Sequence, residues 1–156
     1  MTTDELHEYG VVPMSDDEIR GFLSSQRVGV LGLPSDGAPV MRPLSFWYDG
    51  DARLYFLYIV GASSRKEETS IAADVARFLV YRAETQFNWR SVLLTGRIDE
   101  VTDADLATVP ESMEFAGRPD VLERASQSEE TKLYRFAVEE QRGLKHLGLP
   151  PRFEPE

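Results

Sequence analysis

The chain has no cysteine among its 156 residues and only two histidines, His7 and His146. The absence of cysteine excludes disulfides, thiolate metal sites and thiol nucleophiles. The histidines lie near opposite ends of the chain, so we expect no histidine metal pair, and we expect His146 at the surface. No apolar run approaches the ~20 residues that a membrane-spanning helix needs. These features favour a cytoplasmic protein that does not bind a membrane.

Basic residues are also scarce. The chain has 27 acidic and 17 basic residues, which gives a formal net charge of −10, and only three of the basic residues are lysines. Such a surface repels nucleic-acid backbones, so we expect no nucleic-acid partner. High salt would screen the self-repulsion of this surface, and the composition therefore favours a halophilic protein. A GC-rich genome, which favours arginine codons, would also explain the shortage of lysine.

The length and the hydrophobic content of 42% suit one domain with one core. We find no internal repeat and no linker. We therefore predict a single domain over residues 1–156, with loose arms at 1–13 and 147–156. Ser15-Asp16-Asp17-Glu18 has the pattern of a capping box, which predicts a helix from this point to about Ser25.

The stretch from Arg42 to Val60 is rich in aromatic and β-branched residues and contains Asp49-Gly50, a strong hairpin dipeptide. The apolar run from Leu54 to Val60 is unbroken, so we expect this strand to be covered on both faces. Residues 83–88 are expected to form a loop, and Gly96 to mark a bulge or a close approach of two backbones. The predicted strands span 27–33, 38–47, 54–60, 77–81, 89–101 and 133–139.

Helices are predicted at 64–73 and just after Thr102, and short helical pieces within 110–130. Hairpins that follow one another along the chain form an antiparallel meander, and closure into a barrel removes its exposed edges. The expected fold is therefore mainly β, with the strands closed into an antiparallel barrel and flanked by helices.

A cation-rich junction between strand and helix lies at Gly61-Ala62-Ser63-Ser64-Arg65-Lys66. A helix N-terminus offers unpaired N–H groups, and the hydroxyls of Ser63 and Ser64 add donors. Arg65 and Lys66 are unfavourable against the helix dipole unless an anion lies between them and the helix. We interpret the junction as a candidate phosphate site. The alternative is an exposed first turn with an ordinary cap.

Further cations and flat side chains are predicted near strand ends. Arg42 shares a pleat face with Leu44 and other apolar residues, and it either extends to water or meets an anionic ligand. Trp89-Arg90-Ser91 begins a strand and brings a ring, a cation and a hydroxyl, although a solvated strand end would look the same. Together with Tyr58, these residues suit a phosphorylated planar ligand.

The order of these elements resembles the flavin-binding split-barrel superfamily of pyridoxamine 5′-phosphate oxidase. Within it, the chain is more similar to small nitroimidazole-resistance-like reductases than to the oxidase proper. The resemblance covers roughly residues 15–101, with a weaker match from Tyr134 to Gly143, and it depends on order and spacing more than on a single motif. It is carried by Arg42-Pro43-Leu44-Ser45-Phe46, Asp49-Gly50, Leu54-Tyr55-Phe56, Ser64-Arg65-Lys66, Ile71, Val80, Trp89-Arg90-Ser91-Val92, Gly96 and Val101.

The resemblance implies a six-stranded split barrel and a homodimer with FMN at the interface. It implies that Arg65 and Lys66 bind the FMN phosphate, with Ser64 or Ser63 and Arg42 beside them. It also implies that a group of other residues borders the ring or the ribityl chain, namely Leu44, Ser45, Tyr58, Trp89, Arg90 and Ser91.

We interpret the chain as an FMN-dependent oxidoreductase that acts on a small-molecule substrate of unknown identity. No side chain stands out as a proton donor, so no catalytic residue is assigned. Relatives of this fold leave two alternatives open. One is a reductase that uses a deazaflavin, and the other is a non-catalytic flavin or haem carrier in which His146 is the axial haem ligand.

Overall fold

Seven strands and one helix make up the part of the chain that the computed structural model describes, namely residues 9–59, 75–101 and 131–148. The elements are β1 (Val11–Pro13), α2 (Asp16–Ser25), β2 (Val28–Leu33), β3 (Val40–Tyr48), β4 (Arg53–Ile59), β5 (Val75–Thr85), β6 (Asn88–Glu100) and β7 (Thr131–Leu147). The predicted helices at 64–73 and after Thr102, the segment 110–130 and residues 149–156 of the predicted tail lie outside the described residues. None of the described helices is long and apolar enough to cross a membrane.

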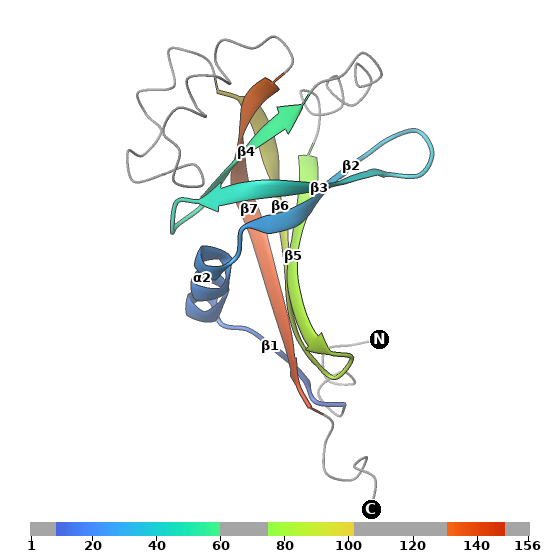
Figure 1. Ribbon diagram of the computed structural model, residues 1–156, viewed down its shortest axis with the longest axis vertical. Helices are drawn as coiled ribbons and strands as arrows, with labels where there is room; N and C mark the ends of the chain where they lie inside the picture. Colours follow the sequence, from blue (N-terminus) through green and yellow to red (C-terminus); the bar gives the residue numbers. More distant parts are fainter. Residues whose placement is uncertain (1–8, 60–74, 102–130, 149–156) are drawn as a thin grey trace, which may run out of the picture.

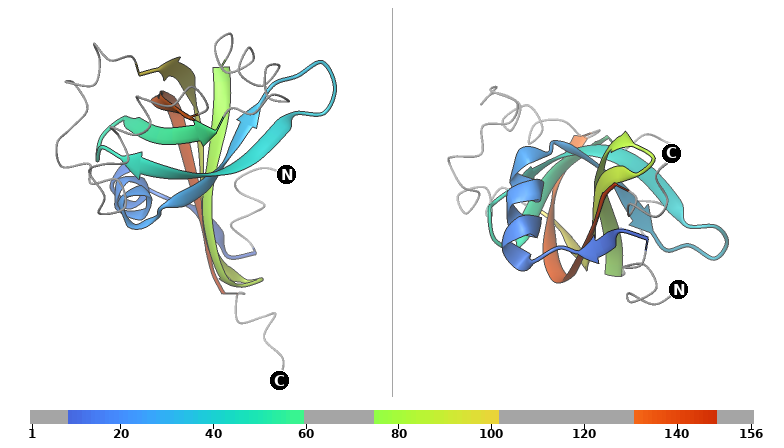
Figure 2. Two further views of the ribbon diagram at one scale, coloured as in Figure 1. Left: turned by 45° about the horizontal axis from the view of Figure 1, so that its top comes forward. Right: turned by 90° about the horizontal axis from the view of Figure 1, so that it is seen from below.

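Six of the strands close into an antiparallel barrel. Their order around it is β7-β4-β3-β2-β5-β6, and β6 pairs back to β7, while β1 adds a short seventh strand on the other edge of β7. Figure 1 shows β5, β6 and β7 running the length of the molecule, with β2 and β3 crossing in front of them. Viewed from below in Figure 2, the strands form the wall of the barrel and α2 lies beside β7. The predicted split-barrel fold is confirmed.

Four phenylalanines from four strands form the centre of the core. The ring of Phe78 stacks on Phe56, with centroids 5.8 Å apart, and meets Phe46 edge-on at 5.4 Å. Phe136 packs against the same ring at 6.3 Å. Each of the four side chains is at most 1% exposed. The predicted double coverage of β4 is confirmed for its first half, because Leu54, Tyr55 and Phe56 are buried one after another.

The predicted capping box forms the start of α2. The Ser15 hydroxyl accepts from the Glu18 amide, and the Glu18 carboxylate accepts from the Ser15 amide. The helix then buries Ile19 and its apolar neighbours against the barrel. It approaches β7 closely at Gly143, where an added Cβ would lie 2.8 Å from the Ile19 side chain.

Three boundaries differ most from the expectation. The arm predicted to be loose ends in β1, whose residues pair with β7 from Leu144 to His146. β5 continues to Thr85, so a tight turn replaces the loop predicted at 83–88. β7 extends to Leu147, well beyond the predicted end at Glu139. In the β5 extension, Arg82 to Thr85 are all exposed, so the sequence has no alternating apolar signal there and backbone pairing alone defines the strand.

Gly96 marks both a bulge and a close approach, as predicted. The pairing of β6 with β7 shifts between Thr95 and Gly96. A Cβ at Gly96 would collide with the backbone carbonyl oxygen of Ala137 and come within 2.9 Å of the Phe136 ring. Because backbone atoms cannot rotate out of the way, the substitution must distort the barrel.

Gly96→Ala is expected to lower the free energy of unfolding by about 1–3 kcal/mol, the usual effect of overpacking a core. The matched control is Gly37→Ala, since nothing lies within 4 Å of a Cβ at Gly37. Denaturant unfolding of the two variants beside the wild type measures the difference. Equal stabilities for Gly96→Ala and the wild type would contradict the close approach.

Candidate functional site

Three of the predicted ligand-binding residues lie where β3 has no partner in β4. β4 pairs with β3 only from Phe46 to Tyr48, so Arg42, Leu44 and Ser45 lie beyond the paired segment. Arg42 is directly opposite Leu31 of β2. It shares the inward face with Leu44, as predicted, but its side chain is exposed, so it does not bear the penalty of a buried charge.

The predicted phosphate-binding residues Ser63, Ser64, Arg65 and Lys66 lie outside the described residues. The strands on either side show where their segment leaves and rejoins the barrel, at Ile59 of β4 and Val75 of β5. Close to the start of β5, Arg77 pairs with Gly32 of β2. Gly32 in turn pairs with Met41 of β3, which is next to Arg42. The segment therefore rejoins the barrel close to Arg42, and a shared phosphate site stays a prediction. The backbone of Tyr58 lies near the end of β4, where the segment leaves the barrel, and it is opposite Lys132 of β7.

An apolar cavity of about 500 Å³ lies on the outside of the barrel beside these residues. Its floor is a row of half-buried side chains that are register neighbours, Val30, Leu79 and Leu93. Arg77 and Thr95 add the polar groups. The complete lining is Val30, Gly32, Leu33, Pro34, Pro39, Met41, Val75, Arg77, Leu79, Leu93 and Thr95. A largely apolar cavity with a few polar groups is the usual form of a small-molecule site.

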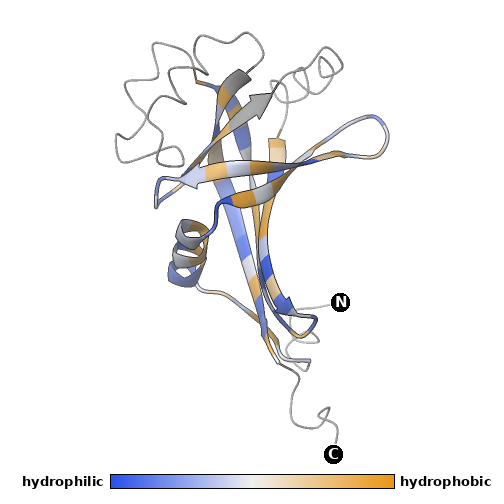
Figure 3. Cartoon of the chain, viewed as in Figure 1, coloured by the Kyte–Doolittle hydropathy of each residue, from blue (hydrophilic) through white to orange (hydrophobic). Residues whose placement is uncertain are grey.

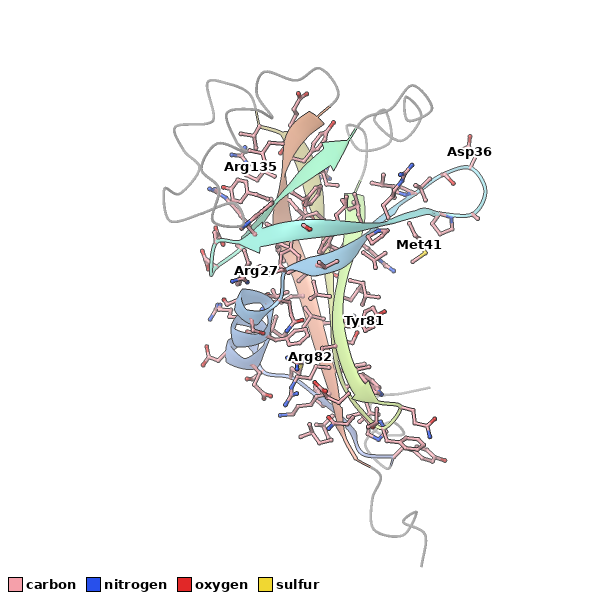
Figure 4. The ribbon with its side chains drawn as sticks, viewed as in Figure 1. Arg27, Asp36, Met41, Tyr81, Arg82 and Arg135 are labelled. Atoms are coloured by element: carbon pink, nitrogen blue, oxygen red, sulfur yellow. The ribbon has the colours of Figure 1, made fainter. Side chains whose placement is uncertain are left out.

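Large exposed hydrophobic side chains surround this cavity. Val28, Met41, Val75 and Tyr81 are 57%, 63%, 39% and 58% exposed. Figure 3 shows hydrophobic stretches along β2, β3 and β5, and Figure 4 shows Met41 and Tyr81 on the side of β5 away from α2. We call these four residues, with Val30, Leu79 and Leu93, the outer apolar face. A contiguous apolar surface of this kind marks a binding site or an interface.

The Trp89-Arg90-Ser91 segment divides between two sides of the sheet. Ser91 pairs with Tyr81 and lies with Trp89 on the outer side, whereas Arg90 is opposite Arg82 on the side of α2. Successive side chains of a strand point to opposite faces, so one ligand surface cannot contain all three.

The structure also does not bring Arg90 and Arg42 together. Arg42 is opposite Leu31, and Leu31 is opposite Phe78 of β5. Phe78 and Arg82, the partner of Arg90, are separated by four positions in β5, which is about 13 Å of strand. The predicted cluster of cations is therefore not formed by these two residues within one chain.

The expectation that His146 lies at the surface is wrong. His146 is 5% exposed, and the rings of Phe87 and Trp89 meet it edge-on at 5.8 and 5.7 Å. Its Nε2 has no hydrogen-bond partner among the residues that the structure describes, and an added Cβ at Gly10 would lie 3.4 Å from this atom. The sequence did not reveal this burial, because the covering residues belong to β1 and the β5–β6 turn, whose structure was not predicted. His146 is buried and Gly10 lies close to its Nε2, so this side chain is not presented at an open surface as an axial haem ligand would be.

Metal ligands are not gathered anywhere in the described ranges, where no group of three or more His, Asp or Glu side chains could hold an ion.

Comparisons with known proteins agree with this fold. The model of the pyridoxamine 5′-phosphate oxidase family matches residues 15–145. A FAD-binding protein from Mesorhizobium loti is 25% identical, with a TM-score of 0.65 over 86% of this chain and 97% of that chain. The comparison with curated proteins finds no match.

Two further solved structures show the same fold at lower identity. A FAD-binding protein from Mycobacterium smegmatis is 16% identical, with a TM-score of 0.59 over 86% of this chain and 97% of that chain. A protein from Bacteroides thetaiotaomicron, described as a 5-nitroimidazole antibiotic resistance protein, is 12% identical, with a TM-score of 0.55 over 86% of each chain.

Proposed function

The chain belongs to the pyridoxamine 5′-phosphate oxidase family, and on that premise we propose that it is a flavin-dependent oxidoreductase. The observation that carries the proposal is the apolar cavity on the outer face of β2, β3, β5 and β6. A flat, largely apolar ring needs such a surface, and the relative from Mesorhizobium loti is a FAD-binding protein. The proposed substrate is a small molecule of unknown identity.

The flavin ring would lie against Val30, Leu79 and Leu93, with the Arg77 guanidinium and the Thr95 hydroxyl as donors at its edge. These residues bind and orient the ring and exclude water from one of its faces. Trp89 and Ser91 extend the same outer side towards the lower part of the barrel. The bound flavin supplies the electron transfer, and the protein supplies position and environment.

The phosphate end of the ligand would lie at the end of β3 that is free of β4, with Ser45 on the outer face and Arg42 and Leu44 reaching it from the inner face. We propose that Ser63, Ser64, Arg65 and Lys66 complete this end and that Tyr58 borders it, as the family resemblance implies. FMN is the form we propose. The relatives named above as FAD-binding proteins bind a nucleotide with the same flavin and the same first phosphate. Arg90 is left out of the site because it faces α2.

We also propose that a second copy of the chain covers the outer apolar face. Met41 and Tyr81 each leave more than half of their surface exposed in one chain. A homodimer would bury them and close the open side of the cavity over the ring. The cofactor would then lie between two chains.

The absorption spectrum of the purified protein tests the cofactor directly. Bands of oxidised flavin are expected, and chromatography of the released cofactor separates FMN from FAD. Bands of a deazaflavin or of haem would replace the flavin assignment. Oxidation of NADH or NADPH by the flavin-loaded protein is then expected, whereas a loaded protein that accepts no electrons from either donor would be a carrier and not an enzyme.

A further inference from the structure

A second cleft, about 450 Å³ in volume, lies on the α2 side of β5 and β6. One wall is the face of α2 that carries Glu18, Phe22 and Ser25, and the other is the lower part of the β5–β6 hairpin. Figure 4 shows Arg82 on this side of β5, whereas Tyr81 points away to the outer apolar face. The lining consists of Met14, Glu18, Gly21, Phe22, Ser25, Gln26, Arg82, Glu84 and Arg90.

Two arginines lie side by side on the hairpin wall of this cleft. Arg82 and Arg90 are direct register partners in β5 and β6, and like charges at such positions destabilise a sheet. Arg82 is compensated, because its Nε donates to Glu84 Oε1 at 2.6 Å. The Arg90 side chain forms neither a hydrogen bond nor an ion pair with any other residue that the structure describes. The positive charge of Arg90 therefore has no counter-charge here.

The remaining carboxylate of the lining is paired elsewhere. Lys145 Nζ donates to Glu18 Oε2 at 2.5 Å. This hydrogen bond, together with the backbone amide of Ser15, lowers the pKa of the Glu18 carboxyl and keeps it ionised at neutral pH. Glu84 and Glu18 are thus matched by Arg82 and Lys145, and one uncompensated cation remains in a protein with a net charge of −10.

The carbonyl end of α2, which borders the cleft, is already satisfied. The Ser25 hydroxyl donates to the Phe22 carbonyl at 2.7 Å, and the Gln26 amide donates to the Leu23 carbonyl at 3.4 Å. Arg27 donates to the Ser24 carbonyl at 2.9 Å. These bonds reduce the negative potential that a helix C-terminus otherwise presents to an anion.

We propose that this cleft binds a small organic monocarboxylate, with its carboxylate on the Arg90 guanidinium and its apolar part on Met14 and Phe22. The single uncompensated charge matches one negative charge, and the planar guanidinium matches a carboxylate in shape. Met14 and Phe22 are each 8% exposed and offer an apolar floor beside it. The site is separate from the proposed flavin site and does not depend on it.

NMR titration of the full chain tests the proposal, with benzoate as the probe and benzyl alcohol as its neutral counterpart. Benzoate is expected to shift the amide signals of α2 and of Arg82 to Arg90 in a saturable manner. Benzyl alcohol, which lacks the charge, is expected to bind at least about tenfold more weakly, because a charge-assisted contact is lost. Inorganic phosphate is titrated in parallel.

Arg90→Gln is expected to weaken benzoate binding about ten- to hundredfold. Arg90→Lys is expected to weaken it less, because lysine keeps the charge but lacks the planar guanidinium that donates two parallel hydrogen bonds to a carboxylate. The matched control is Arg97→Gln, which removes an exposed cation of the same strand that pairs with Glu139 at 3.0 Å. This control is expected to bind benzoate as the wild type does. Amide spectra of each variant confirm that it is folded.

Three results would overturn the proposal. The first is benzoate affinity that is unchanged in a folded Arg90→Gln variant. The second is binding of phosphate in place of benzoate, or equal binding of benzyl alcohol. The third is loss of the flavin bands from Arg90→Gln, which would assign this side chain to the cofactor. Absence of flavin from the wild type would refute the proposed function alone and leave this titration unaffected.

Discussion

Leu79→Arg is expected to behave as a monomer of 17.6 kDa, whereas the wild type is expected to form a dimer of twice that mass. Leu79 lies in the middle of the outer apolar face, between Val30 and Leu93. A guanidinium placed there would be buried without a partner when two copies associate, which costs about 3–5 kcal/mol for each chain. Light scattering at micromolar concentration measures the mass. Because one wall of the flavin cavity is lost with the partner, bound flavin is expected to fall as well.

The matched control for this prediction is Ser24→Arg. It adds the same charge at an exposed position of α2, on the side of the barrel away from the outer apolar face. This variant is expected to remain dimeric and to retain its flavin. A Leu79→Arg protein that stays dimeric would show that the interface lies elsewhere. It would contradict the proposal that a second chain covers the cavity.

Lys66→Ala is expected to raise the dissociation constant for FMN about ten- to hundredfold. The reason is the loss of one charge-assisted contact to the phosphate, which contributes about 1.5–3 kcal/mol. The phosphate is close to a dianion at neutral pH, so the predicted arginine and lysine beside the predicted helix start would bind it strongly. Fluorescence titration of the apoprotein with FMN measures the change, and the variant is expected to release flavin on dialysis while its barrel stays folded.

Riboflavin is the matched ligand for this test because it lacks the phosphate. It is expected to bind the wild type and Lys66→Ala about equally and weakly. Wild-type affinity of Lys66→Ala for FMN would move the anchor to Arg42, which lies beside the point where β5 rejoins the barrel. If Arg42→Ala also bound FMN normally, the phosphate site would be refuted.

The hairpin, the helix start and the bulge could be predicted because their signals are local, and the family resemblance supplied the closure of the strands into a barrel. Asp49 and Gly50 form the expected hairpin, with Asp49 Oδ1 accepting from the amide of Asp51 at 2.8 Å and Gly50 at a positive φ. The capping box before α2 and the bulge at Gly96 are also local patterns, and both are present. Each depends on a few neighbouring residues, and this is why sequence alone identified it.

The missed features depend on distant partners. β1 has three residues and exists because β7 offers it an edge. The burial of His146 follows from that strand and from Phe87, neither of which has a signal at His146 itself. The separation of Arg90 from Arg42 also follows from the pairing register across several strands. The positions of the cations along the chain do not specify that register.

The central claim is that a flavin lies between the outer apolar faces of two chains. Gel filtration of the purified protein with light scattering and flavin absorption recorded together tests it most directly. We predict one peak at twice 17.6 kDa that carries one flavin for each chain, and loss of both the flavin and the dimer in Leu79→Arg. A flavin-loaded monomer of the wild type, or a dimer that binds no flavin when FMN is added, would contradict the claim.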